Sequence, residues 1–160
     1  MNIIDSSGAL ALSTRLQRLA EQLRKDGALF YKSYGIQFEP KWFPVILTLA
    51  HRPLLSVIEV ATEIGYTHPS TISLLKELEK EKLIQSKKDK TDERKRLLSL
   101  TKKGTELVET MQPIWKVMQQ ALDEIVSNEN HLLKAINQAE EALKKQSFLQ
   151  RANEIKLKKI

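Results

Sequence analysis

The stretch from Thr67 to Gly104, THPSTISLLKELEKEKLIQSKKDKTDERKRLLSLTKKG, is the most informative part of this 160-residue chain. It begins with a helix that has Pro69 near its start, where the missing backbone donor of proline is not needed. Two short segments, 83–87 and 95–100, flank the polar turn 89–93, and a new helix starts after them. A helix followed by a basic two-stranded hairpin predicts a winged helix-turn-helix.

Charge is segregated along the chain. Residues 84–104 carry eight Lys or Arg against three Asp or Glu, and residues 144–160 carry six against one. The segment 105–143 between them holds two Lys and seven acidic residues, and the whole chain has a net charge of +6. A basic hairpin beside a helix-turn-helix favours a nucleic-acid partner. For the basic C-terminal segment, a solvated surface is an equal alternative.

The chain lacks the residues that several classes of protein need. It has no cysteine, which excludes disulfides, thiolate-zinc sites and cysteine redox sensing. Its three histidines lack metal-ligand spacing, and neither a phosphate-binding glycine loop nor a Ser/His/Asp arrangement is visible. Neither a signal peptide nor a run of the roughly 18–20 apolar residues of a membrane span is present. We therefore expect a soluble cytoplasmic protein that uses no metal or cofactor and is not an enzyme.

Helical patterns also precede residues 67–104. Leucines at spacings of four, three and four predict a helix over residues 8–33, with Ser6 and Ser7 as plausible caps. Pro40 precedes a second predicted helix over 41–51. A very short strand is expected at 54–55.

The next helix is expected over residues 57–64. Ser56 and Glu59 have the spacing of a capping box, and Gly65 is a typical residue at the end of a helix. In the helix that follows, four residues at helical spacing are expected to face the core: Thr71, Leu74, Leu75 and Leu78.

Two long helices are expected after the hairpin. The first runs from Thr101 to about Ser127, where Pro113 is expected to bend it, and the second covers 129–148. Together with the first helix they carry more leucine than one small domain needs. A second copy of the chain would cover this surface as a two-fold dimer, and a helical cap packed on the same chain is the alternative.

The wing and its exit, Asp89 to Gly104 (DKTDERKRLLSLTKKG), resemble the MarR family of winged helix-turn-helix regulators. Asp92 and Arg94 match the family's Asp-x-Arg, and an apolar strand, Leu-Thr and Lys-Gly follow. The resemblance covers about residues 10–147. The recognition helix and FEPKWFPV (38–45) are closest to the branch in which an acetyltransferase domain follows, and here nothing follows residue 160. We therefore expect the regulator part alone.

The turn after the recognition helix departs from the family. The family usually has a glycine where this chain has Lys82. Because lysine is unfavourable in left-handed backbone, we expect this turn to be built differently.

The resemblance implies a mainly α fold with a small β-hairpin wing, flanked by long N- and C-terminal dimerisation helices. It implies one domain over residues 1–160, with dimerisation regions at 8–35 and 105–148 and the winged helix-turn-helix at 40–104. Residues 149–160 form a basic tail. Three roles stay open for this tail: it is disordered, contacts phosphates, or extends the last helix against a partner subunit.

In this arrangement the helix over residues 68–82 lies in the DNA major groove. Its outward face supplies the candidate contacts His68, Ser70, Ile72, Ser73 and Lys76. Hydroxyls and lysine can bond base edges, and His68 can touch a phosphate. For Ile72, contact with a thymine methyl and packing against the preceding helix are equal alternatives.

The wing supplies the second set of candidate DNA contacts. Arg94 is expected to enter the minor groove, with Asp92 holding its guanidinium in place. A surface ion pair of little energetic weight is the alternative for these two residues. Four further basic residues are expected to contact phosphates, which adds affinity without reading sequence: Lys87, Lys88, Lys95 and Arg96.

An aromatic cluster lies where the first helix meets the second. MarR relatives often bind small effectors between the dimer helices and the DNA-binding lobe, so the resemblance implies an effector pocket lined by Tyr31, Tyr34, Phe38, Trp42, Phe43 and Trp115. The alternative is that these aromatic residues are simply core.

The expected function is that of a homodimeric transcriptional regulator that binds a palindromic site in double-stranded DNA. Modulation by a small-molecule effector is left open. Two rival functions lack a feature that excludes them. One is a winged helix used as a protein-interaction module, whose binding would not depend on Arg94. The other is an architectural protein that binds DNA without sequence preference.

Overall fold

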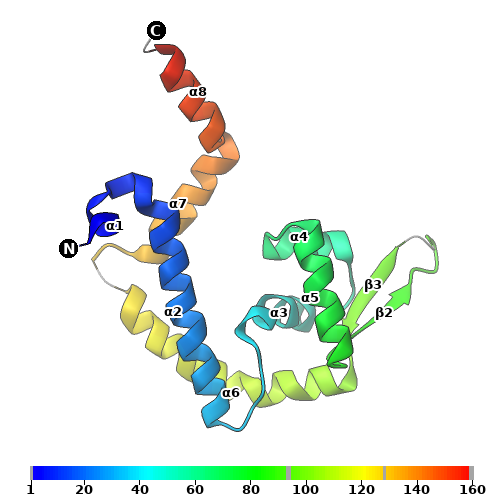
Figure 1. The fold of residues 1–160 in the computed structure, drawn as a ribbon. Helices are drawn as coiled ribbons and strands as arrows, with labels where there is room; N and C mark the ends of the chain where they lie inside the picture. The colour runs from blue at the N-terminus through cyan, green and yellow to red at the C-terminus, as the bar shows by residue number, and fades with distance from the viewer. Residues whose placement is uncertain (1, 93–94, 128, 159–160) are drawn as a thin grey trace. The chain divides into compact units, whose positions relative to one another are not determined.

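A computed structural model describes residues 2–92, 95–127 and 129–158 (Figure 1). The chain forms two compact units, residues 1–114 and 115–160, and the boundary falls within one long helix. The elements in chain order are α1 (Ile3–Ser6), η1 (Gly8–Ala11), α2 (Leu12–Ser33), η2 (Pro40–Trp42), α3 (Phe43–His51), β1 (Leu55–Ser56), α4 (Val57–Ile64), α5 (His68–Lys80), β2 (Ile84–Lys88), β3 (Arg96–Leu100), α6 (Lys102–Val126), α7 (Leu132–Lys145) and α8 (Phe148–Lys158).

A three-stranded antiparallel sheet completes the first unit. Its order is β1-β3-β2, so β3 lies in the middle, with Leu98 opposite Leu55 on one side and Ser86 on the other. β2 and β3 extend beyond β1 as a hairpin beside α5 (Figure 1). The predicted fold class, mainly helical with a small hairpin wing, is therefore confirmed.

The core of this unit lies among α3, α4, α5 and the sheet. The four residues of α5 that were expected to face the core are buried. Thr71 is fully buried, and its hydroxyl donates to the carbonyl of Thr67 over 3.0 Å, so its polar group is satisfied. Other side chains that are almost completely buried include Val45, Ile46, Leu49, Val60, Leu98 and Met111.

Local signals predicted the ends of α4. The Ser56 hydroxyl accepts from the amide of Glu59, and the Glu59 carboxylate accepts from the amide of Ser56 over 2.8 Å, which completes the predicted capping box. The hydrogen bonds from the hydroxyl and amide of Ser56 lower the pKa of Glu59 below its ordinary value. Gly65 ends the helix in left-handed backbone at φ 70°.

The start of the first long helix differs from the prediction. Ser6 and Ser7 do not cap it, because both hydroxyls donate to the carbonyl of Ile3. A separate one-turn helix, α1, precedes it and is capped by Asn2. Gly8, at φ 57°, then opens a 3-10 turn before α2 begins at Leu12.

Other boundaries also shift. The second predicted helix begins as the 3-10 turn η2, and each wing strand starts one residue later than expected. The last predicted helix, 129–148, corresponds to α7, which ends before Gln146, where the backbone is extended at φ −156°. A separate helix, α8, covers residues 149–158 of the predicted basic tail, so this part is helical and not disordered. Pro113 lies inside α6. Neither the expected bend at Pro113 nor the division into dimerisation regions is tested, and both stay predictions.

The turn after α5 contradicts the expectation of a differently built turn. Lys82 adopts left-handed backbone at φ 58°. Its amide donates to the carbonyl of Glu79 over 2.9 Å, and the amide of Leu83 donates to that of Leu78 over 3.0 Å. These two bonds form a Schellman motif, in which the buried side chains of Leu78 and Leu83 accompany the turn. Lysine therefore occupies the position that favours glycine.

Replacing this lysine by glycine should stabilise the fold. We expect Lys82→Gly to raise the free energy of unfolding by about 0.5–1 kcal/mol, because relief of the left-handed strain exceeds the entropy cost of glycine. Urea unfolding followed by circular dichroism measures this change. Lys82→Ala is the control: it keeps the Cβ, so an equal gain in this variant would contradict the explanation.

Candidate nucleic-acid interface

The helix-turn-helix consists of α4 and α5, joined by residues 65–67. Thr67 caps α5, since its hydroxyl accepts from the amide of Ser70, and Pro69 lies in the first turn. Of the predicted contacts on α5, four are exposed: His68, Ser70, Ser73 and Lys76. Ile72 is half-buried, and neither of its two proposed roles is tested.

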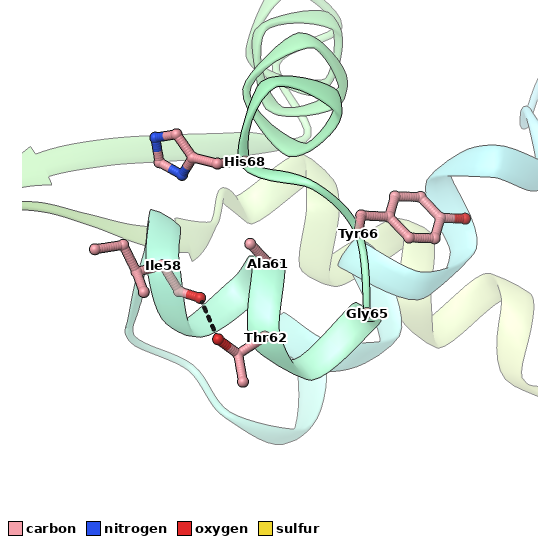
Figure 2. Close-up of a pocket in the computed structure, with 6 residues that line it drawn as sticks. All are labelled: Ile58, Ala61, Thr62, Gly65, Tyr66 and His68. Carbon is pink, nitrogen blue, oxygen red and sulfur yellow. Dashed lines mark hydrogen bonds between the residues drawn. The ribbon is translucent and has the colours of Figure 1, made fainter. Parts of the chain in front are cut away.

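A shallow apolar hollow of about 580 Å³ lies between α4 and the start of α5. Figure 2 shows Ile58 and His68 on one side of the hollow and Tyr66 on the other. Ile58 is 68% exposed, and its carbonyl accepts from the hydroxyl of Thr62 over 2.9 Å. His68 therefore lies at the start of α5, next to an apolar surface formed by α4.

The turn of the wing is built around Asp89. Its carboxylate accepts from both the amide and the hydroxyl of Thr91, each over 2.7 Å. These hydrogen bonds lower the pKa of Asp89 below its ordinary value. The amide of Asp89 donates to the carbonyl of Lys95, and the amide of Lys95 donates to that of Asp92. Arg94 lies outside the described residues, so its proposed pairing with Asp92 stays a prediction.

Three of the four predicted phosphate contacts, Lys87, Lys88 and Lys95, are exposed on the wing. The fourth, Arg96, is bound within the chain. Its guanidinium lies 2.9 Å from the carboxylate of Glu79 and also donates to the hydroxyl of Ser86. Arg96 thus links β3 to α5, and its proposed phosphate contact would compete with Glu79.

The Leu-Thr and Lys-Gly pairs, residues 100–101 and 103–104, form a junction between α5 and α6. The sequence did not predict this role. The Thr101 hydroxyl donates to the carbonyl of Lys82 over 2.7 Å and accepts from the amide of Gly104 over 3.0 Å. The amide of Thr101 donates to the carbonyl of Leu83 over 3.0 Å. A Cβ at position 104 would overlap the carbonyl oxygen of Leu83. The junction therefore holds the end of α5 against the start of α6.

Of the six predicted effector residues, three are buried and three are half-buried or exposed. Tyr31, Phe38 and Trp42 are buried and stack edge to face, with ring centroids 5.1 and 5.7 Å apart. Tyr34 is 52% exposed, and Phe43 is half-buried. Trp115, also half-buried, belongs to the second unit. Within the first unit the buried group supports the alternative that these residues are core.

Trp42 also borders a hollow of about 260 Å³ that sequence reasoning missed. The other residues that line it come from the segment before η2, from the turn after α5 and from α6: Gln37, Glu81, Leu83, Lys103, Glu106, Leu107 and Thr110. These residues are distant in sequence, and no spacing rule connects them.

Glu77 on α5 connects the recognition helix to η2. Its carboxylate lies 2.8 Å from the ammonium group of Lys41 and accepts from the indole of Trp42 over 3.0 Å. The hydrogen bond from Lys41, assisted by that from Trp42, lowers the pKa of Glu77 below its ordinary value of 4.5. The same pairing raises the pKa of Lys41.

This pairing predicts a pH dependence of stability. Because the pKa of Glu77 is lower in the folded than in the unfolded chain, its stabilisation is complete above the ordinary value of 4.5 and is lost as the pH falls through the folded pKa. We expect stability to fall less steeply over this range in Glu77→Gln than in the wild type. Urea unfolding midpoints at a series of pH values measure the difference. Parallel curves would contradict the role of Glu77.

Two features are absent from the described residues, which are 2–92, 95–127 and 129–158. Within these ranges no helix is long and apolar enough to cross a bilayer. The same residues contain no cluster of three or more His, Asp or Glu that could hold a metal ion.

The chain is similar to known proteins in two ways: one segment matches a family model, and the fold matches solved structures. The model of the MarR family matches residues 34–95. The transcriptional repressor CouR bound to a 23-mer DNA duplex is 25% identical, with 84% of this chain and 96% of that chain covered and a TM-score of 0.66. The MepR–DNA complex of S. aureus is 23% identical (84% and 98% covered, TM-score 0.66). The M. tuberculosis transcriptional regulator MOSR in complex with DNA is 18% identical (83% and 96%, TM-score 0.71). No curated protein matches.

The fold and the family match together define the class of protein. The chain has a winged helix-turn-helix in which α5 and the β2–β3 hairpin are adjacent. Its winged-helix segment, residues 34–95, matches the model of the MarR family, and the chain is similar in fold to transcriptional regulators. The resemblance stated from Asp92 and the wing sequence is therefore confirmed.

Proposed function

We propose that the protein is a homodimeric transcriptional regulator that recognises a palindromic site in double-stranded DNA. The observation that carries the proposal is the exposed N-terminal half of α5, with Ser70, Ser73 and Lys76, next to a basic hairpin. In three solved structures of the same fold the protein is bound to DNA, which supports the same use of these elements here.

The side chains of the helix and of the wing suit different parts of the DNA. The hydroxyls of Ser70 and Ser73 donate to or accept from base edges in the major groove, and Lys76 reaches a guanine or a phosphate. Lys87, Lys88 and Lys95 contact phosphates along the flanking backbone. Arg94 enters the minor groove at the wing, where groove width and potential guide it.

Exposed apolar side chains support the homodimer. On α2, Leu12, Leu16 and Leu19 are 58%, 45% and 39% exposed, although they form one helical stripe. In the second unit Leu133 and Leu143, on α7, are 58% and 54% exposed. A second copy would cover these surfaces and set the two recognition helices about 34–36 Å apart, which matches one turn of DNA.

A small-molecule effector would regulate binding by favouring one separation of the two recognition helices. The hollow beside Trp42 supports a place for such a molecule. It touches the turn after α5 at Leu83 and the first turns of α6 at Lys103, so a ligand there would contact the junction that positions the recognition helix. The effector role expected for Tyr34, Phe43 and Trp115 stays a prediction.

Selection of bound duplexes from a random DNA pool tests the proposal. An enriched palindrome would support a dimeric, sequence-specific regulator and would also identify its site. Binding without enrichment, fading as salt rises, would favour the nonspecific architectural function instead. Absence of DNA binding would overturn the proposal and favour a protein-interaction module.

A further inference from the structure

A second hollow lies at the start of α5, and two cationic side chains from outside the helix-turn-helix line it. Its volume is about 410 Å³, and its lining consists of Arg24, Lys41, Tyr66, Thr67 and Ser70. Arg24 comes from the middle of α2, and Lys41 comes from η2. The fold therefore places two positive charges beside Ser70, one of the residues proposed to contact bases.

The two cations differ in their partners. The ammonium group of Lys41 lies 2.8 Å from the carboxylate of Glu77, so one of its donors is occupied and its charge is largely balanced. Arg24 is exposed, and its guanidinium forms no ion pair or hydrogen bond with any residue that the structure describes. Its guanidinium is thus an uncompensated charge with all its donors available, which suits a phosphate group.

We propose that Arg24, assisted by Lys41, binds a phosphate of the DNA strand that passes the start of the recognition helix. The inference rests on the proposed function and extends its DNA interface to α2. Thr67 and Ser70 lie at the end of α5 that approaches the bases, so a phosphate on the flanking backbone would come within reach of the same hollow. The contact orients the protein on the duplex without reading sequence.

The slope of log K against log salt concentration tests this contact. One phosphate contact contributes about 0.9 to the slope, so Arg24→Ala should reduce its magnitude by about 0.9 for each protomer. Arg24→Lys, which keeps the charge, should restore most of the slope. The preference of the variant among duplexes should equal that of the wild type, because a phosphate contact weakens binding to all sequences alike.

Lys25→Ala is a matched control, because it removes one exposed charge from the adjacent position of α2, and Lys25 does not line the hollow. A slope in Arg24→Ala equal to that in Lys25→Ala would overturn the inference. A change in sequence preference in Arg24→Ala would also overturn it, since Arg24 would then read bases.

The two proposals fail in different ways. The titration uses a duplex with the enriched sequence or, if none is enriched, a random duplex of equal length. If the wild type binds neither duplex, both the proposed function and this inference are wrong. If the wild type binds and its slope does not depend on Arg24, only the inference is wrong. Circular dichroism of Arg24→Ala should match the wild type, because the side chain is exposed and unpaired.

Discussion

Gly104→Ala should destabilise the first unit by about 3 kcal/mol, a large part of the 5–15 kcal/mol by which folded proteins are usually stable. The added methyl would overlap the carbonyl oxygen of Leu83 and lie 3.1 Å from its carbonyl carbon. Neither atom can move freely, because the oxygen accepts from the amide of Thr101 and Leu83 is itself buried. The start of α6 would have to separate from the turn after α5.

Chemical unfolding followed by circular dichroism measures this loss, as a lower urea midpoint at unchanged slope. Lys102→Ala is the control, because it replaces an exposed side chain two positions earlier in the same helix and should change stability by less than about 0.5 kcal/mol. If Gly104→Ala matched this control, the close approach of α6 to Leu83 would not exist in solution.

Arg94→Ala should weaken binding to the selected palindrome by about 1–3 kcal/mol for each wing, which corresponds to roughly 5- to 150-fold. The reason is the sequence Asp-x-Arg on a narrow basic hairpin, since an arginine there can enter the minor groove. Because groove width depends on sequence, the variant should also lose preference at the positions beneath the wing. Parallel selections from a random DNA pool, with wild type and variant, measure both effects.

Lys95→Ala provides the comparison for Arg94. Lys95 is exposed at the neighbouring position of the wing, and a phosphate contact there would reduce affinity for all sequences equally. The enriched palindrome should therefore survive in Lys95→Ala and blur in Arg94→Ala. If Arg94→Ala selected the same palindrome with undiminished affinity, the proposed role of the wing arginine would be wrong.

Several features of the fold could be predicted because they depend on neighbours a few residues apart. The capping box of Ser56 and Glu59 and the left-handed Gly65 are of this kind. The buried face of α5 also followed from spacing alone. The prediction that Ser6 and Ser7 cap the first long helix was wrong. Their hydroxyls donate to the carbonyl of Ile3 in a helical turn that propensity did not predict. Short-range rules thus succeed when one local partner dominates.

The prediction of a differently built turn at Lys82 was wrong. Propensity disfavours lysine in left-handed backbone, yet the Schellman hydrogen bonds and the burial of Leu78 and Leu83 hold it there. The packing of two leucines outweighs a local strain of about 1–2 kcal/mol. The conformation of Lys82 therefore depends on the residues against which the turn packs, and the sequence of the turn does not predict them.

The class of this protein could be predicted from three features of the sequence. The periodicity of Leu74, Leu75 and Leu78 predicts the helix, the charge predicts the basic hairpin, and local spacing gives the Asp-x-Arg of the wing. Three other features become visible in the folded chain alone: Arg96 binds Glu79, position 104 has no room for a methyl group, and Arg24 lines the same hollow as Ser70. The last of these pairs is separated by 46 positions along the chain. Contacts over such separations arise from the way helices pack, and local propensities do not encode them.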